Sequence, residues 1–107
     1  MPPIRVLVAN EPRAYREAIA AGLRELRPAF DVVETDPAGL DAAVVRLAPA
    51  FVVCSEVTEV VETRSPAWVL LYPEGTRLAV ASVAGEHATT GELDLAGLLA
   101  LLDRAAA

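Results

Sequence analysis

The chain has 107 residues, of which 54% are hydrophobic, and nine basic residues face fifteen acidic ones, so the formal net charge is −6. This length fits a single domain, residues 1–107, whose core is large enough to fold without a disulfide or a metal. The acidic balance argues against nucleic acid as a partner, because duplex binding needs a clustered basic surface. All nine basic residues are arginine, and the chain contains no lysine.

Targeting signals and membrane spans are not expected. The N-terminal segment has only a short apolar run after one arginine, well below the hydrophobic region of a secretory signal peptide. The longest apolar stretch, residues 95–102, is less than half of the ~20 residues that a bilayer span requires. Cys54 is the only cysteine, so no intrachain disulfide can form. We therefore expect a cytoplasmic protein without membrane association.

The first half of the chain alternates strand and helix patterns. Short, apolar runs predict buried strands at residues 4–9, 30–34 and 51–54. Hydrophobic residues at three- and four-residue spacing predict one helix at 13–27 and a second that opens with Asp36-Pro37 and ends at Pro49. Strands joined by helices in this way imply right-handed crossovers and a parallel sheet covered on both faces.

The second half is less regular. Residues 57–64 predict one or two helical turns, and residues 67–72 predict a fourth strand. The Pro-Glu-Gly-Thr turn sequence that follows, and the strand-like composition of residues 77–83, favour a β-hairpin over 67–83, with a short helix at 77–84 as the alternative. A final helix is expected at 94–104, with leucines as its packing face.

Three segments of the first half resemble the receiver domain of bacterial response regulators. Residues 4–23 read IRVLVANEPRAYREAIAAGL, similar to the family's first strand, acidic pair, loop and helix, with Arg16-Glu17 in place without gaps. Residues 27–43 read RPAFDVVETDPAGLDAA, similar to the second strand and helix, and residues 47–56 read LAPAFVVCSE, similar to the approach to the third strand's end. The resemblance covers mainly residues 1–56. It implies a flavodoxin-like three-layer α/β sandwich with a mostly parallel sheet of strand order 2-1-3-4-5.

The residues that carry phosphoryl transfer in that family are not matched. Receivers place an acidic pair after the first strand, an acceptor aspartate after the third, a serine or threonine after the fourth and a lysine after the fifth. Carboxylates there hold Mg²⁺, and the metal and lysine neutralise the phosphoryl oxygens. The matching positions here are Asn10 and Glu11, then Ser55 with Glu56 beside it, then Tyr72. The resemblance therefore implies a degenerate phosphoacceptor site that holds no metal and no cofactor.

We interpret the chain as a non-catalytic pseudo-receiver, a signalling module that binds protein partners independently of phosphorylation. A homodimer is also expected, because the leucine stripe of the last helix could exceed what one sheet face covers. Two alternatives stay open. One is a small-ligand-binding domain of flavodoxin-like form, and the other is an enzyme with a site around Glu11, Ser55 and Glu56.

Three further residues have competing interpretations. His87 lies in a polar stretch expected to be a loop, and sequence spacing alone does not exclude its pairing with Ser55 as a base. Cys54, in an apolar strand, is expected to be an inert core residue and not a redox sensor. Trp68 begins the fourth strand and is equally consistent with an interface anchor and with a cover for the end of the core.

Overall fold

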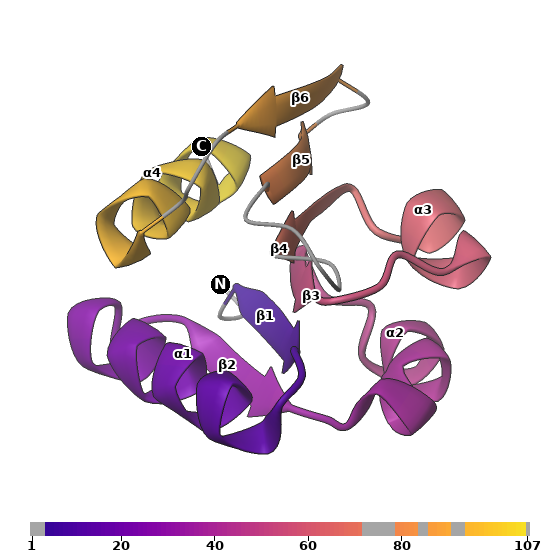
Figure 1. The fold of residues 1–107 in the computed structure, drawn as a ribbon, viewed down its shortest axis with the longest axis horizontal. Coiled ribbons are helices and arrows are strands. Elements are labelled where there is room, and N and C mark those ends of the chain that lie inside the picture. Colours follow the sequence, from indigo (N-terminus) through magenta and orange to yellow (C-terminus); the bar gives the residue numbers. More distant parts are fainter. Residues whose placement is uncertain (1–3, 72–78, 84–85, 91–93, 107) are drawn as a thin grey trace.

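The computed structural model describes residues 4–71, 79–83, 86–90 and 94–106. A six-stranded mixed sheet lies between two helical layers in an α/β architecture (Figure 1). Helices α1 (Arg13–Leu26) and α4 (Leu95–Ala106) cover one face, and α2 (Leu40–Leu47) and α3 (Glu59–Arg64) lie on the other. The strands are β1 (Arg5–Ala9), β2 (Asp31–Glu34), β3 (Phe51–Cys54), β4 (Ala67–Leu71), β5 (Ala79–Val83) and β6 (Glu86–Thr90). None of the helices in the described ranges is long and apolar enough to cross a membrane.

The sheet runs in the order β2-β1-β3-β4-β5-β6. Strands β2, β1, β3 and β4 pair in parallel, and β1 lies beside β3 inside the sheet, as predicted from their unbroken apolar character. Strand β5 pairs antiparallel with β4, which confirms a hairpin in preference to a helix. Residues 72–78, which include the predicted turn, lie outside the described part of the chain. Strand β6 extends the sheet in antiparallel fashion, so the expected five-stranded, mostly parallel sheet is a mixed sheet of six strands.

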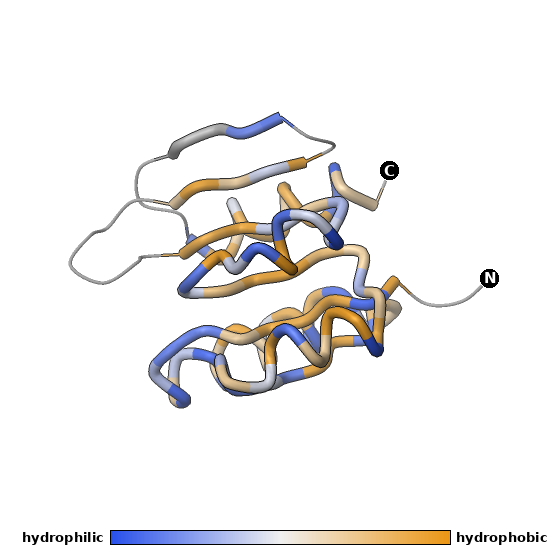
Figure 2. Tube along the Cα trace, turned by 90° about the vertical axis from the view of Figure 1, so that its right-hand side faces the viewer, coloured by the Kyte–Doolittle hydropathy of each residue, from blue (hydrophilic) through white to orange (hydrophobic). Residues whose placement is uncertain are grey.

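Strand β6 was not predicted. Residues 86–90 belong to a stretch that the sequence analysis assigned to a polar loop, yet they pair with β5 along their whole length. The pairing is made by backbone groups at the sheet edge, while the side chains of Glu86 and His87 stay exposed (Figure 2 shows the hydrophilic start of this strand). An edge strand of this kind carries no hydrophobic alternation, so the usual sequence signal is missing.

The helices α1 and α4 pack side by side on their sheet face. Gly22 of α1 lies against Leu95 of α4, and a Cβ at Gly22 would come within 3.1 Å of the Leu95 Cδ2 atom. The missing side chain therefore lets the two helices approach closely. Farther along both helices, the Arg27 guanidinium donates to both carboxylate oxygens of Asp103, at 3.0 and 2.7 Å. Leu98, Leu99 and Leu102 of α4 are buried against this face, so the sheet and α1 cover most of the leucine stripe.

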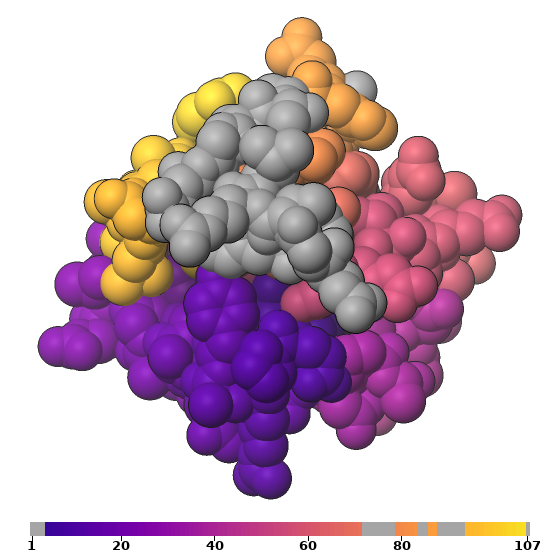
Figure 3. All heavy atoms as spheres, in the orientation of Figure 1, coloured from indigo at the N-terminus to yellow at the C-terminus, as the bar shows by residue number. Residues whose placement is uncertain are grey.

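The opposite helical layer begins at the predicted cap. The Asp36 carboxylate accepts a 2.7 Å hydrogen bond from the Gly39 N–H, which opens a 3₁₀ turn, Pro37–Gly39, that continues into α2. The Thr58 hydroxyl caps α3 by accepting from the Val61 N–H at 3.2 Å. The same hydroxyl donates to the Asp41 carboxylate at 2.6 Å, so one threonine holds α3 in place beside α2. Figure 3 shows the atoms of these two helical regions next to each other on the surface.

The core has two halves because successive side chains of a strand point to opposite faces. Val53 of β3 packs under α1 and α4, whereas its neighbours Val52 and Cys54 pack under α2 and α3. Trp68 belongs to the second half and is only 5% exposed, so it covers the core and is not an exposed interface anchor. Cys54 is fully buried, and burial raises the pKa of its thiol to about 12, in line with an inert core residue.

Candidate functional site

The carboxyl ends of β1 and β3 bring four of the five predicted site residues together. Ala9 is the register partner of Cys54 in this parallel pair, so the chain leaves both strands at the same edge of the sheet. Asn10 and Glu11 follow β1 there, and Ser55 and Glu56 follow β3. The fifth position, Tyr72, lies outside the described residues. Ligand sites of open α/β sheets are found at this edge.

The Ser55 hydroxyl joins the two strand ends. Its oxygen accepts the backbone N–H of Glu11 at 2.9 Å and the side-chain amide of Asn10 at 3.4 Å. These two donors occupy the lone pairs that a nucleophilic hydroxyl would need for attack. Ser55 thus holds the β1–α1 connection against the end of β3.

Asn10 is the most deeply buried polar residue of the site. Its side chain is 0% exposed, and its Oδ1 atom has no hydrogen-bond partner among the described residues. A neutral amide bears this burial at a far lower cost than a carboxylate, which would place an unpaired charge inside the protein. Asparagine at this position is therefore consistent with a site that does not use a carboxylate to hold a metal.

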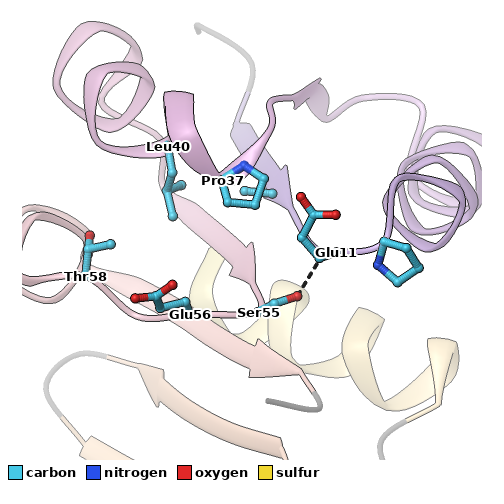
Figure 4. Close-up of a pocket in the computed structure, with 8 residues that line it drawn as sticks. Glu11, Pro37, Leu40, Ser55, Glu56 and Thr58 are labelled. Atoms are coloured by element: carbon cyan, nitrogen blue, oxygen red, sulfur yellow. Dashed lines mark hydrogen bonds between the residues drawn. The ribbon is translucent and has the colours of Figure 1, made fainter. Parts of the chain in front are cut away.

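A pocket of about 410 Å³ opens beside these residues (Figure 4). Its walls come from the end of β1, the loop that leads into α1, the 3₁₀ turn before α2, and the loop between β3 and α3. The apolar lining residues are Ala9, Pro12, Pro37 and Leu40, and the polar ones are Glu11, Ser55, Glu56 and Thr58.

The polar side chains of the pocket are not arranged for acid–base catalysis. In Figure 4 the Ser55 hydroxyl faces the Glu11 backbone, whereas the Glu56 carboxylate lies on the Thr58 side. No hydrogen bond joins the Glu56 carboxylate to the Ser55 hydroxyl, although both residues are described. Glu56, which follows β3 together with Ser55, therefore does not act as a general base for the Ser55 hydroxyl.

The described lining of the pocket carries no positive charge. None of the described residues that line it is basic, and two of them are glutamates. The four salt bridges formed between described residues involve other carboxylates: Arg5–Asp31, Arg13–Glu17, Arg24–Glu34 and Arg27–Asp103. Glu11 and Glu56 are both exposed, and neither has an ionic partner within the described ranges. The pocket thus presents two uncompensated carboxylates.

His87 does not belong to this site. Strands β4 and β5 separate β6 from β3, a distance of about 14 Å at the usual strand spacing. The imidazole instead contacts Trp68 in a T-shaped arrangement, with the ring centroids 5.4 Å apart. The pairing of His87 with Ser55 is therefore excluded. Within the described residues, no group of three or more acidic, histidine or cysteine side chains is placed to hold a metal ion.

Five of the described pocket residues were not predicted as site residues: Ala9, Pro12, Pro37, Leu40 and Thr58. Pro37 and Leu40 were interpreted only as the opening and the inner face of a helix, and Thr58 was not singled out. These loops converge because of the order of the strands in the sheet, so the composition of the loops does not identify their residues as part of a site. The one local sign was Thr58 before Glu59, a typical N-cap sequence.

No family model, curated protein or solved structure matches the chain.

Proposed function

We propose that this chain is a receiver-like regulatory module that acts through protein–protein interaction and is neither phosphorylated nor an enzyme. The observation that carries the proposal is the hydrogen bonding of Ser55, the residue at the acceptor position. Its oxygen is already engaged by Glu11 and Asn10, in a pocket whose described lining has two carboxylates and no cation.

Electrostatics opposes phosphoryl transfer at this place. A phosphoryl group carries roughly −1.5 to −2 charges near neutral pH. Each pair of like unit charges about 4 Å apart costs about 1 kcal/mol in water and about 4 kcal/mol near a protein surface. Glu11 and Glu56 would both repel the group, and phosphoryl-transfer sites depend on cations to offset such charge.

The proposed flavodoxin-like fold is supported by the strand neighbours and by helices on both faces. The order β2-β1-β3-β4-β5 is contained in this sheet, with two helices on each side. The antiparallel strands β5 and β6 depart from a receiver, and they alter the half of the domain in which the chain resembles that family least.

The direct test is intact-mass measurement after incubation with acetyl phosphate and Mg²⁺. We expect no phosphoryl adduct on the wild-type chain. We also expect none on Ser55→Asp, because that variant restores a nucleophile but not a neutralising cation. An adduct on the wild type that is lost in Ser55→Ala would overturn the proposal. An adduct on Ser55→Asp alone would show that only the nucleophile is missing, against the electrostatic argument.

A second candidate function is the binding of a small ligand in the same pocket. Its volume, about 410 Å³, lies within the range of known ligand pockets, roughly 300–1,000 Å³. Apolar walls with a few converging polar groups are also typical of such sites. The apolar residues and the two carboxylates of the described lining disfavour an anionic ligand.

A further inference from the structure

We propose that the pocket between Glu11 and Glu56 receives an arginine side chain of a protein partner. The inference rests on the proposed interaction function and names the group that the site recognises. It follows from the charge of the pocket, from its apolar walls and from the hydrogen-bonding capacity of its polar atoms.

Charge complementarity selects a cation. Glu11 and Glu56 line the pocket from two different strand ends, and neither has an ionic partner among the described residues. The other described residues that line it are neutral. An anionic occupant would be repelled from both sides, whereas a cationic one would meet two carboxylates that are free to accept hydrogen bonds.

The apolar walls favour a cation on an aliphatic stem over an inorganic ion. Ala9, Pro12, Pro37 and Leu40 supply half of the described lining residues and have no side-chain ligand to offer a metal. A hydrated ion would gain nothing from them. The methylene groups of an arginine or lysine can pack on such a surface while the charged head stays near the carboxylates.

The hydroxyls of the pocket have little capacity left to accept hydrogen bonds from a ligand. The Ser55 oxygen already accepts two N–H groups, and the Thr58 hydroxyl donates to Asp41 and accepts from Val61. The remaining polar atoms are mainly carboxylate oxygens, which are acceptors only. A guanidinium offers five donors in a planar fork and is less strongly hydrated than an ammonium group, so arginine fits this set better than lysine.

The experiment is an NMR titration of the ¹⁵N-labelled full chain with Nα-acetyl-L-arginine amide. The matched probe is Nα-acetyl-L-citrulline amide, which has nearly the same shape without the charge. We expect saturable shifts at the Ser55, Glu56 and Thr58 amides with the arginine probe, with a Kd on the order of 1 mM for so small a ligand. The citrulline probe is expected to bind at least tenfold more weakly.

Variants connect the binding to the pocket. Glu11→Gln and Glu56→Gln are each expected to weaken arginine binding by about two- to fivefold, the range for exposed ion pairs. Glu62→Gln, on the exposed side of α3 and outside the pocket lining, is the matched control and should leave the Kd unchanged.

Three outcomes overturn the inference: no saturable shift with arginine, equal binding of citrulline, or equal weakening by Glu62→Gln. The second would indicate an apolar site, and the third a diffuse effect of net charge. None of them produces a phosphoryl adduct, so the proposed absence of phosphorylation would stand. Conversely, an adduct with acetyl phosphate would overturn the proposed function even if arginine bound as expected.

Discussion

Alkaline pH should destabilise this protein through Cys54. The thiol is fully buried, and its sulfur lies 3.7 Å from the Val69 carbonyl oxygen. Burial in apolar surroundings disfavours the thiolate and raises the pKa from 9.0 to about 12. Because the folded-state pKa is raised, the contribution to stability is complete below pH 9 and is lost as the pH rises towards 12.

The magnitude follows from linkage. Between the two pKa values the unfolded chain releases a proton that the folded chain retains, and each pH unit costs about 1.4 kcal/mol. At about pH 10.5 the free energy of unfolding should therefore be lower by about 2 kcal/mol than at about pH 8, from this group alone.

The assay is urea denaturation of the wild type and of Cys54→Ala over this pH range. Alanine removes the titration, and although it leaves a small cavity, that cost is the same at every pH. Tyrosine ionisation is common to both proteins, so the difference between their pH slopes isolates the thiol. Parallel slopes would refute the argument. A folded-state thiol that reacts with a disulfide reagent as fast at about pH 8 as the urea-unfolded chain would refute it too.

Three further predictions concern local contacts and assembly. Ser55→Ala removes the acceptor of the Glu11 N–H and should lower the free energy of unfolding by about 1 kcal/mol in urea denaturation, whereas Ser55→Thr, which keeps the hydroxyl, should cost less. Thr58→Val removes the cap of α3 and its bond to Asp41 and should also cost about 1 kcal/mol, against less than about 0.5 kcal/mol for Thr63→Val within the same helix. The homodimer remains a prediction, although burial of the α4 leucines removes its main argument. Sedimentation that gives a dimer at micromolar concentration would support it, and a monomer over a wide concentration range would contradict it.

The first half of the fold could be predicted because its signals are local and strong. Strands β1 and β3 are buried on both faces, so nearly every residue of their segments is apolar. The start of the second helix was marked by Asp36 and Pro37, whose capping role depends only on residues three positions away. Strand β6 has no such local signal. It is defined by its pairing with β5, and its side chains Glu86 and His87 are exposed to solvent.

The site was predictable in its position but not in its shape. Parallel pairing of β1 and β3 was enough to place Glu11 near Ser55, and this juxtaposition is confirmed. The pocket also needs Pro37, from the turn before α2, and Thr58, a helix cap whose partner, Asp41, lies on another helix. Such contacts depend on how α2 and α3 pack, and no local pattern encodes them.

The placement of α4 bears on how the chain acquires its structure during synthesis. Ile19 and Leu23 of α1 share a core with Leu98 and Leu102, which the ribosome adds more than 70 residues later. Until those leucines emerge, α1 covers only part of its side of the sheet, while α2 and α3 can already close the other. A nascent chain that stops after β4 would therefore present an apolar surface to chaperones, which bind such exposed surfaces on incompletely folded chains.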